Sequence, residues 1–548
     1  MGLNLKSVFS AQILVLSAAI LVMFGCASVQ KPMGGPRDRT PPKLLLATPL
    51  NQTRNFKATS IKLDFDEYFK LSNTYQEITI SPAMEKIEYK TKGKSLVINF
   101  KDTLVKNTTY VINFGKAIVD VNEGNVMKNF TYVFSTGPHI DSLSVSGNVT
   151  NTQTQEKEKD ATVMLIPLKQ DSAYFGKKKP TIYATTDTSG NFTLANLHDG
   201  DYRIYALKEA SPNKIYDNES ELIAFLKKPI HLTKDTSNIH LSLFKQLSDK
   251  FRVLEHKFNA DGAMFFTFNL PLIEPDVRIN YPAGLNDQKI ADFGTKKDTA
   301  LIYMKNMDFD SISVSFMDKG KILDTISIRK QRKESFVRSI IPTYNINNDN
   351  KLKPGTDLTI LMNTPIESFD VSRIILLEDS VSRTNFTLTK DPLNPKHLFI
   401  KYRWRQGVAY QITFNEGSFV NIYGDKNKRL IRPFRIDKPE NYGSIIMNVT
   451  IPDSTKSYIL ELINDQKKVM QTNIIKKSTI INYKDIIAGK YQVRVTYDNN
   501  NNGRWDSGNV KRNVYPEQIV LIPTTYTIRP NWVSDDSRID IPKEIITP

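Results

Sequence analysis

The chain has 548 residues and a hydrophobic content of 40%, which suits four or five domains of about 100–150 residues better than one exceptional core. The formal net charge is +16 at pH 7, but lysines and acidic residues alternate along the sequence without long single-sign blocks. A solvated surface accounts for this balance, and a basic face toward anionic lipid headgroups or an acidic partner is the alternative. We expect no nucleic-acid partner, because the N-terminus directs the protein out of the cytosol.

The first 25 residues are predicted to be a signal peptide. Lys6 supplies a small positive region, and the apolar run 13–24 is too short for an ordinary membrane-spanning helix. A glycine and then Cys26 follow, and Cys26 is the single cysteine of the chain, so it has no internal disulfide partner. This position resembles the acylated cysteine of a lipobox, although Met23 and Phe24 replace the usual Leu and small residue. The resemblance implies lipidation at Cys26, and a buried thiol in an uncleaved anchor helix is the alternative.

Residues 26–40 are expected to form the lipidated cysteine and a flexible tether. Gly and Pro dominate residues 32–36, and nothing in the segment is periodic.

Short segments of alternating apolar and polar residues, bounded by Asn, Gly, Pro and Asp, recur through the rest of the chain. Residues 60–65, 110–114 and 202–206 show this alternation clearly. Such strands bury one face each, so two antiparallel sheets can close a core between them. The sequence therefore predicts an all-β chain of tandem β-sandwiches. Residues 219–226 are the candidate for a short helix, with a loop and a strand as the alternative.

Two internal repeats indicate two copies of a two-domain unit, separated by a further β segment near residues 250–335. One set of matches is displaced by 300 positions and the other by 289. The matched pairs are Tyr110/Tyr410, Ile112/Ile412, Phe114/Phe414, Gly124/Gly424, Gly200/Gly489, Tyr202/Tyr491, Glu209/Asp498, Asn213/Asn502, Tyr216/Trp505 and Asp217/Asp506.

Residues 34–137 resemble a family of Ig-like lipoproteins of the Bacteroidota. The segment 34–42 (GGPRDRTPP) looks like the opening of that family. Residues 61–67, with 132–137 as the final strand, resemble a bacterial Ig-like domain of the S-layer type. Surface-exported lipoproteins of the Bacteroidota often carry acidic residues directly after the acylated cysteine, and none occurs here before Asp38. The resemblance therefore implies an outer-membrane lipoprotein, with the periplasmic face favoured over the cell surface.

Residues 184–209 resemble a transthyretin-like domain, the sandwich found as a regulatory module in some carboxypeptidases. Within this segment, residues 186–192 (TDTSGNF) form a predicted hairpin whose turn is Ser189-Gly190 and whose Phe192 returns to the core.

These observations divide the chain into a signal peptide, a tether, five domains and a tail. The predicted parts are a signal peptide (1–25), lipidated Cys and tether (26–40), Ig-like domain (41–138), transthyretin-like sandwich (139–247), β-rich domain (248–335), second Ig-like repeat (336–438), second transthyretin-like repeat (439–536) and tail (537–548).

No catalytic motif stands out in the sequence. The six histidines are never closer than nine positions, so no HxH or HExxH metal site occurs, and GxSxG and a Walker loop are absent. We therefore expect no catalytic residue, and the protein is predicted not to be an enzyme.

The one candidate ligand site is the Asn-rich segment 498–506. Asp498, Asn500, Asn502 and Asp506 occupy oxygen-ligand positions of an EF-hand-like loop with a glycine at its sharp turn. The twelfth position is Asn509 instead of the usual Glu, so we expect weak Ca²⁺ binding at most. The alternative is a loop in which the Asn side chains cap their own backbone turns, with no cofactor at all.

The sequence favours a lipid-anchored, non-catalytic structural or protein-interaction module of the cell envelope. Its expected partners are the outer membrane, through the acyl chains, and other envelope proteins, including an outer-membrane protein complex. A surface glycan-binding lipoprotein is the alternative, and it would need aromatic platforms from the three tryptophans Trp404, Trp505 and Trp532. A hydrolase carrying transthyretin-like modules is a third hypothesis, but no catalytic domain can be placed for it.

Overall fold

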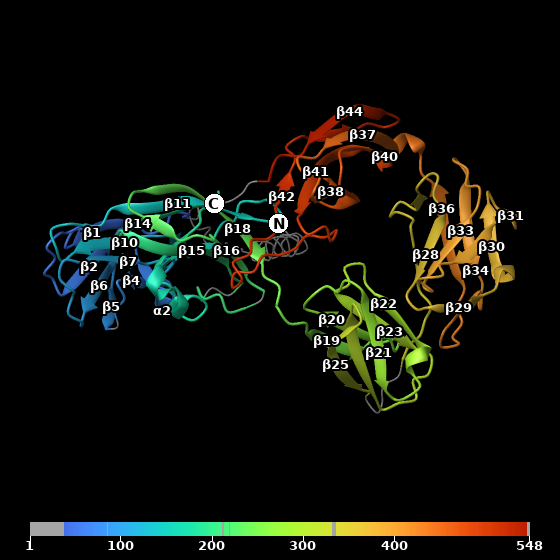
Figure 1. Cartoon of the computed structure of the whole chain (residues 1–548), viewed down its shortest axis with the longest axis horizontal. Coiled ribbons are helices and arrows are strands. Elements are labelled where there is room, and N and C mark those ends of the chain that lie inside the picture. The colour runs from blue at the N-terminus through green and yellow to red at the C-terminus, as the bar shows by residue number, and fades with distance from the viewer. Residues whose placement is uncertain (1–37, 85, 211–212, 219, 331–335, 545–548) are drawn as a thin grey trace, which may run out of the picture. The chain divides into compact units, whose positions relative to one another are not determined.

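The computed structural model describes residues 38–84, 86–210, 213–218, 220–330 and 336–544. The predicted all-β fold class is confirmed, since strands make up 51% of the described structure and helices 4%. Figure 1 shows the strands arranged in successive sets. The chain divides into two compact units, residues 1–140 and 141–548. Five strand sets, each with a hydrophobic core of its own, follow one another along the described residues, and we name them the first to the fifth sandwich.

The first sandwich fills the described part of the first unit. Its sheets have the strand orders 1-2-6-5 and 10-7-4, and strands 3, 8 and 9 form a small third sheet. Strand 2 shows why the sequence folds this way: alternate residues Ile61, Leu63 and Phe65 are at most 2% exposed and enter the core. Its elements are β1 (Leu44–Thr48), β2 (Ser60–Phe65), β3 (Phe69–Leu71), α2 (Thr74–Glu77), β4 (Thr79–Ser81), β5 (Ile87–Lys92), β6 (Ser95–Phe100), β7 (Thr109–Asn113), β8 (Ile118–Asp120), β9 (Val126–Met127) and β10 (Thr131–Ser135).

The second sandwich begins the second unit. Strand 11 pairs with strand 14 antiparallel and with strand 18 parallel, and strand 12 lies between strands 13 and 15. The helix predicted at 219–226 is wrong, because the described residues Leu222–Phe225 form a strand, as the alternative had it. Its elements are β11 (Leu143–Asn151), β12 (Thr162–Pro167), η1 (Leu168–Gln170), α3 (Asp171–Tyr174), β13 (Ile182–Thr185), β14 (Asn191–Leu197), β15 (Gly200–Lys208), β16 (Leu222–Phe225), β17 (Ile230–Leu232) and β18 (Thr236–Lys245).

The third sandwich packs a four-stranded sheet on a three-stranded one, with strand orders 19-20-23-22 and 21-24-25. Its core includes the edge-to-face pair Phe266 and Phe316, whose ring centroids are 4.7 Å apart. Its elements are β19 (Val253–Phe258), β20 (Met264–Phe268), β21 (Pro275–Tyr281), η2 (Asn286–Gln288), β22 (Lys289–Phe293), β23 (Thr299–Met304), β24 (Ser311–Asp318) and β25 (Lys321–Arg329).

The fourth sandwich has sheet orders 26-28-33-32 and 27-36-34-30-31, with a small 29-35 sheet. Strands 28, 33 and 32 pair as β2, β6 and β5 do in the first sandwich, and strands 36, 34 and 30 pair as β10, β7 and β4 do. Its elements are β26 (Pro342–Tyr344), β27 (Lys351–Leu352), β28 (Leu358–Met362), β29 (Ile366–Phe369), η3 (Val371–Arg373), β30 (Ile374–Glu378), β31 (Val381–Arg383), β32 (Thr387–Lys390), β33 (His397–Lys401), β34 (Ala409–Phe414), β35 (Phe419–Asn421) and β36 (Leu430–Ile436).

The fifth sandwich repeats the pairing of the second. Strand 37 pairs with strand 40 antiparallel and with strand 44 parallel, and strand 41 pairs with strands 38, 42 and 43. Its last strand continues past residue 536, where the sequence predicted the tail to begin. Its elements are η4 (Pro439–Asn441), β37 (Tyr442–Thr450), β38 (Ser457–Asn464), β39 (Val469–Ile475), β40 (Thr479–Ile487), β41 (Gly489–Asp498), β42 (Ile519–Leu521), β43 (Tyr526–Ile528) and β44 (Val533–Asp540).

A buried tyrosine marks the same corner in the first and fourth sandwiches. The Tyr110 hydroxyl accepts the backbone N–H of Val105 at 2.9 Å, and the Tyr410 hydroxyl accepts the backbone N–H of Arg405 at 2.7 Å. Each tyrosine stacks on a phenylalanine of the neighbouring strand, with ring centroids 5.2 Å apart in the first copy and 5.5 Å in the second. The tyrosine therefore fixes a connection outside the sheet while its ring fills the core.

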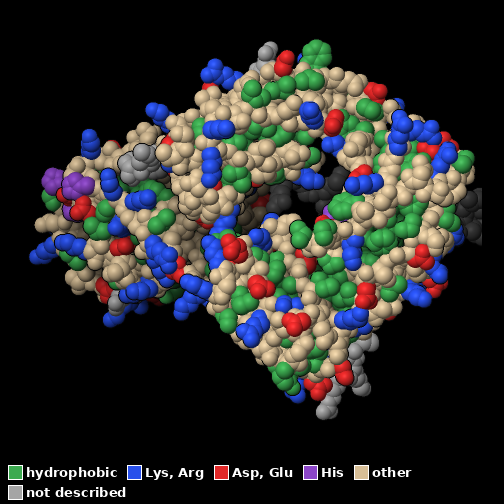
Figure 2. All heavy atoms as spheres, turned by 45° about the vertical axis from the view of Figure 1, so that its right-hand side comes forward, with side chains coloured by type: hydrophobic (Ala, Val, Ile, Leu, Met, Phe, Trp, Pro, Cys, Tyr) green, Lys and Arg blue, Asp and Glu red, His purple; other side chains and the backbone are tan. Residues whose placement is uncertain are grey.

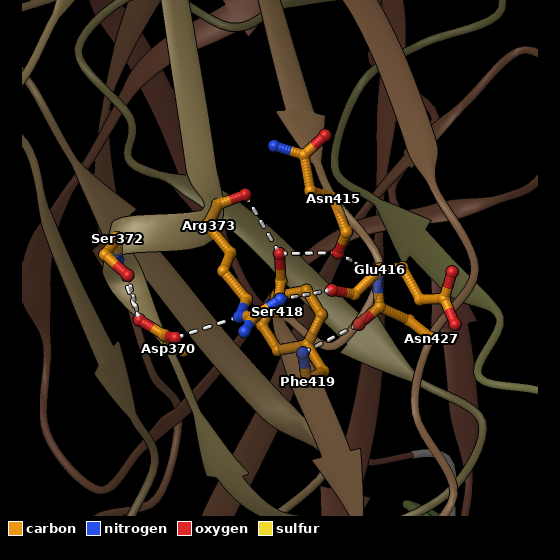
Figure 3. A network of polar contacts seen from close by, with 8 residues as sticks. All are labelled: Asp370, Ser372, Arg373, Asn415, Glu416, Ser418, Phe419 and Asn427. Carbon is orange, nitrogen blue, oxygen red and sulfur yellow. Dashed lines mark hydrogen bonds and ion pairs between the residues drawn. The ribbon is translucent and has the colours of Figure 1, made fainter.

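A polar network fastens the β34–β35 loop of the fourth sandwich to the residues before β30 (Figure 3). Arg373 donates from Nε to Asp370 at 3.0 Å and from Nη1 to the backbone carbonyl of Glu416 at 3.2 Å. The buried Ser418 hydroxyl donates to the Arg373 carbonyl at 3.1 Å. Asn427, also fully buried, accepts the N–H of the residue after Ser418 at 2.7 Å. The loop is thus held by side chains that satisfy its own backbone groups.

In the first sandwich the corresponding loop, between β7 and β8, is held by a side chain of the opposite charge. There the Glu77 carboxylate accepts the backbone N–H of Lys116 at 3.1 Å, whereas in the fourth sandwich Arg373 donates to a backbone carbonyl. Both side chains lie one or two residues before the strand that pairs with the tyrosine strand. A carboxylate can hold an N–H and a guanidinium can hold a carbonyl, so the two copies reach one geometry with different residues.

We expect Tyr110→Phe to lower the free energy of unfolding by about 1 kcal/mol, because it leaves the Val105 N–H without its acceptor. Tyr410→Phe should cost about 2 kcal/mol, because that hydroxyl also donates to the buried Glu378 carboxylate at 3.1 Å. Urea unfolding of the full chain measures both losses, and hydrogen exchange should show faster exchange confined to the corner that carries the substitution. Equal exchange at both corners in either variant would contradict the role of each tyrosine hydroxyl in holding its own corner.

Candidate functional site

The predicted lipidation residue Cys26 lies outside the described residues. The four candidate calcium ligands lie together at the end of β41 and in the long loop that follows it. Asp498 is the last residue of β41 and is fully buried, and Asn500, Asn502 and Asp506 belong to the loop. We name residues 498–517 the Asn-rich loop.

Backbone donors of the Asn-rich loop converge on the Asp498 carboxylate. The N–H of Asn502 lies 3.0 Å from Oδ1 and the N–H of Gly503 lies 2.8 Å from Oδ2, and the Ser457 hydroxyl also donates to Oδ2. Further along the loop, Asn502 donates from Nδ2 to Asp506 at 2.6 Å. The tight turn at Gly503 has φ +77°, a conformation that favours glycine.

Glu517 completes this arrangement, and the sequence analysis did not find it. Its carboxylate accepts the backbone N–H of Asn499 at 2.7 Å and that of Asp506 at 2.9 Å, so it joins the beginning and the middle of the loop. Burial, and to a smaller degree the Asp506 and Asp498 carboxylates, raise the pKa of Glu517 to about 7. The only sequence signal for this residue is an acid at the edge of β42, 11 positions beyond the last candidate ligand.

The polar groups of the loop satisfy one another and do not present a converging set of oxygens to a cation. Asn500 and Asn502 donate from their amide nitrogens to Asp506, and the Oδ1 of each accepts the backbone N–H of the residue two positions ahead. Within the described ranges, no group of three or more His, Cys, Asp and Glu side chains is placed to hold a metal ion. The residues therefore fit the self-capped alternative better than a calcium site, and Ca²⁺ binding stays a prediction.

The corresponding loop of the second sandwich has the same hydrogen bonds. Glu209 accepts the N–H of Asn213 at 2.8 Å and that of Lys214 at 2.9 Å, as Asp498 does 289 positions later. Asn213 donates from Nδ2 to Asp217 at 2.9 Å, as Asn502 does to Asp506. A lysine with φ +63° stands where the fifth sandwich has Gly503. The pattern thus forms without the glycine and without the full set of Asn residues.

A hollow of about 330 Å³ lies beside the Asn-rich loop, over the outer face of the fifth sandwich. Gln153 of the second sandwich also lines it, and its carbonyl accepts a hydrogen bond from Arg494 Nη1 at 3.5 Å. Glu461 of β38 and Arg494 of β41 are direct cross-strand partners in its floor, and Arg494 Nε donates to Glu461 at 2.7 Å. Trp505 of the Asn-rich loop lines the hollow, with its indole N–H bonded to the Glu517 carbonyl at 2.9 Å. We name it the Trp505 hollow.

Charged side chains do not gather into one field on the visible surface. Figure 2 shows Lys and Arg side chains scattered among acidic ones over the face in view. This distribution agrees with the solvated-surface interpretation of the net charge of +16. Among the described residues, no helix is both long and apolar enough to cross a membrane.

Glu517→Gln should make stability less dependent on pH. Because the folded-state pKa of about 7 lies above the ordinary pKa of a glutamate, 4.5, folding favours the protonated carboxyl. The associated stabilisation is full below about pH 4.5 and is lost as the pH rises to about 7. The wild-type chain should therefore lose up to about 3 kcal/mol relative to the variant over this interval. Urea unfolding of both proteins at pH 5 and pH 8 measures the difference, and a parallel pH dependence would contradict it.

No curated protein sequence matches the chain. Among solved structures, the Bacillus anthracis TIE protein is 10% identical, with 93% of this chain and 76% of that chain covered, at a TM-score of 0.14. The major pilin subunit BcpA of Bacillus cereus is 12% identical, with coverages of 74% and 100%, at a TM-score of 0.14. The S-layer protein rSbsC(31-844) is 9% identical, with coverages of 88% and 67%, at a TM-score of 0.14.

A family match covers the first sandwich. The model of the bacterial Ig-like domain family matches residues 38–136. This range ends one residue after β10. This agrees with the Ig-like resemblance of that segment and with its two packed sheets. The first sandwich is therefore similar in sequence to a bacterial Ig-like domain.

Proposed function

We propose that the protein is a lipid-anchored scaffold of the cell envelope, built from five sandwich modules, that binds other envelope proteins and performs no chemistry. The observation that carries this proposal is the way the sandwiches of residues 141–548 are joined. Buried side chains of one sandwich contact another, so this unit is suited to hold surfaces at fixed positions. The bacterial Ig-like match at residues 38–136 supports a structural role.

A buried polar contact joins the third and fourth sandwiches. Tyr303 of β23 is 1% exposed, and its hydroxyl donates to the backbone carbonyl of Asn363 at 3.2 Å. Lys396, which is 9% exposed, donates to the same hydroxyl at 3.4 Å and forms an ion pair with Asp292 of β22. While the junction is closed, Lys396 is buried and needs both partners from the third sandwich to offset its desolvation.

The Asn-rich loop joins the fifth sandwich to the second, and we name this contact the clasp. The Tyr515 ring lies 5.2 Å from the Phe225 ring, and its hydroxyl accepts the Lys227 N–H at 2.9 Å. Val510 donates its N–H to the Gln246 side chain at 2.8 Å. Apolar packing and backbone hydrogen bonds thus combine across about 260–290 positions of sequence.

Gly508 allows the close approach of the loop in the clasp. A Cβ atom at this position would lie 2.7 Å from Phe244 and 2.8 Å from Pro516. We therefore expect Gly508→Val to open the clasp, with faster hydrogen exchange and faster limited proteolysis of residues 505–516. The matched control is Tyr515→Phe, which keeps the ring and loses one hydrogen bond, and it should change exchange only slightly. If Gly508→Val left the loop as protected as the wild type, the clasp would be refuted.

The anchor proposal predicts that Cys26 carries acyl chains. Wild-type cells should incorporate a palmitate label into the protein and retain it in the membrane fraction, whereas Cys26→Ser should lose the label and the membrane fraction. An unlabelled wild-type protein, or unchanged fractionation of the variant, would overturn the anchor.

The scaffold proposal is tested with the same two strains. In-cell crosslinking followed by purification should recover envelope proteins with the wild-type chain, and fewer of them with Cys26→Ser. Recovery of no envelope partner from the wild type would overturn the scaffold. Protease treatment of intact cells then distinguishes the leaflets, because we propose the periplasmic face, where the protein would survive.

A second candidate function is glycan binding, and the Trp505 hollow is the specific observation that favours it.

A further inference from the structure

The second and fifth sandwiches repeat one topology, but their outer faces differ. In the second sandwich this face is apolar, and Met164, Ile166, Tyr183 and Tyr205 are at most 5% exposed beneath the residues that cover them. Part of the cover is the excursion between β12 and β13, which brings Tyr174 and Phe175 over the face, and the Phe175 ring lies 4.1 Å from the Tyr205 ring. The space above the sheet is therefore filled by the chain itself.

The same face of the fifth sandwich is polar and hollow. β38 and β39 are joined by a short connection of residues 465–468, which brings no aromatic residue over the sheet. The Asn-rich loop and Gln153 of the second sandwich border this face instead and leave the hollow between them. Thr472, Glu461 and Arg494 lie side by side across three strands, because Thr472 and Arg494 are both direct partners of Glu461. Thr496 of the next row also lines the Trp505 hollow. Hydroxyl, carboxylate and guanidinium groups thus form its floor.

The charges around the hollow are paired with one another. Glu461 and Arg494 form an ion pair at 2.7 Å, and their side chains are 19% and 25% exposed. Arg504, which also lines the hollow, lies 3.5 Å from Asp506. Paired charges present hydrogen-bond donors and acceptors without a strong net field, so they favour a neutral polar ligand over an ion.

An aromatic wall beside such a floor fits a sugar ring. Trp505 lines the hollow and also packs against the outer cluster of the second sandwich, so its half-buried ring is held in place. A pyranose has an apolar face of C–H groups that can lie against such a ring, and a rim of hydroxyls. A volume of about 330 Å³ lies at the small end of the range for ligand sites. We propose that the Trp505 hollow binds one neutral sugar unit of a glycan, with its ring against Trp505 and its hydroxyls on Glu461, Arg494 and the two threonines.

Titration of the full chain with neutral saccharides tests this proposal. The probes are glucose, galactose, mannose, N-acetylglucosamine and their linear oligomers, with galacturonic acid oligomers as the charged comparison, and the measurement is isothermal titration calorimetry. At least one neutral saccharide should bind. Trp505→Phe, which keeps a smaller ring, should weaken that binding about 2–10-fold. Glu461→Gln, which keeps the size of the side chain, should weaken it about 10-fold.

Trp532→Phe is the matched control. Trp532 is 60% exposed on the same sandwich and does not line the hollow, so its replacement should leave binding unchanged. Hydrogen exchange of β38 and β41 checks that each variant keeps the sheet. Absence of binding by every neutral saccharide, binding of the acidic oligomers alone, or equal affinity in wild type, Trp505→Phe and Glu461→Gln would overturn the proposal. These outcomes do not depend on the lipid anchor or on protein partners.

Discussion

The unit of residues 141–548 depends on one constraint: the sheet of β13, β12, β15 and β16 is apolar on both faces. Its inner face belongs to the core of the second sandwich, and its outer face carries a second cluster of buried residues. An apolar face of this size cannot stay in water without a large cost, so something must cover it. The chain covers it with the β12–β13 excursion, with Tyr216, and with Trp505, Val510 and Tyr515 of the Asn-rich loop. Residues far apart in sequence are thereby required to meet.

The duplication explains why a loop of the fifth sandwich can cover the apolar outer face of the second. Tyr216 and Trp505 occupy equivalent positions in the two copies, and both pack against the outer cluster of the second sandwich. The carboxylate at the end of the preceding strand, Glu209 or Asp498, fixes the loop by accepting two backbone N–H groups. Such a loop is held at its base by a side chain of the sheet and along its length by its own hydrogen bonds. It is therefore free to place its aromatic residues on a neighbouring sandwich.

Sequence reasoning predicted the local features of the fold and missed the long-range ones. Alternation predicted β2 at residues 60–65 as the structure has it. A strand that buries one face has an apolar residue at every second position, and this pattern is visible in the sequence. The segment 222–225 was harder, since Leu222, Ile223, Ala224 and Phe225 form a continuous apolar run that a helix or a doubly buried strand explains equally well. The four candidate residues of the Asn-rich loop lie close together, and Ca²⁺ binding there stays a prediction. Glu517 was missed because it meets the beginning of its loop from 18 positions away, and the Glu461–Arg494 pair was missed because strand register is not encoded in a local pattern.

The two copies show how much chemistry one backbone geometry permits. Glu77 and Arg373 hold the same connection through opposite charges, and the turn at Lys214 and Gly503 has a positive φ in both sandwiches. The two copies differ on the outer face. In the second sandwich this face carries aromatic side chains, and in the fifth it carries the Glu461–Arg494 ion pair with two threonines beside it. Filling the face with aromatic residues makes a surface for packing, whereas leaving it polar and open makes a surface for a ligand. A duplicated scaffold can therefore assign cohesion to one copy and recognition to the other without changing the fold.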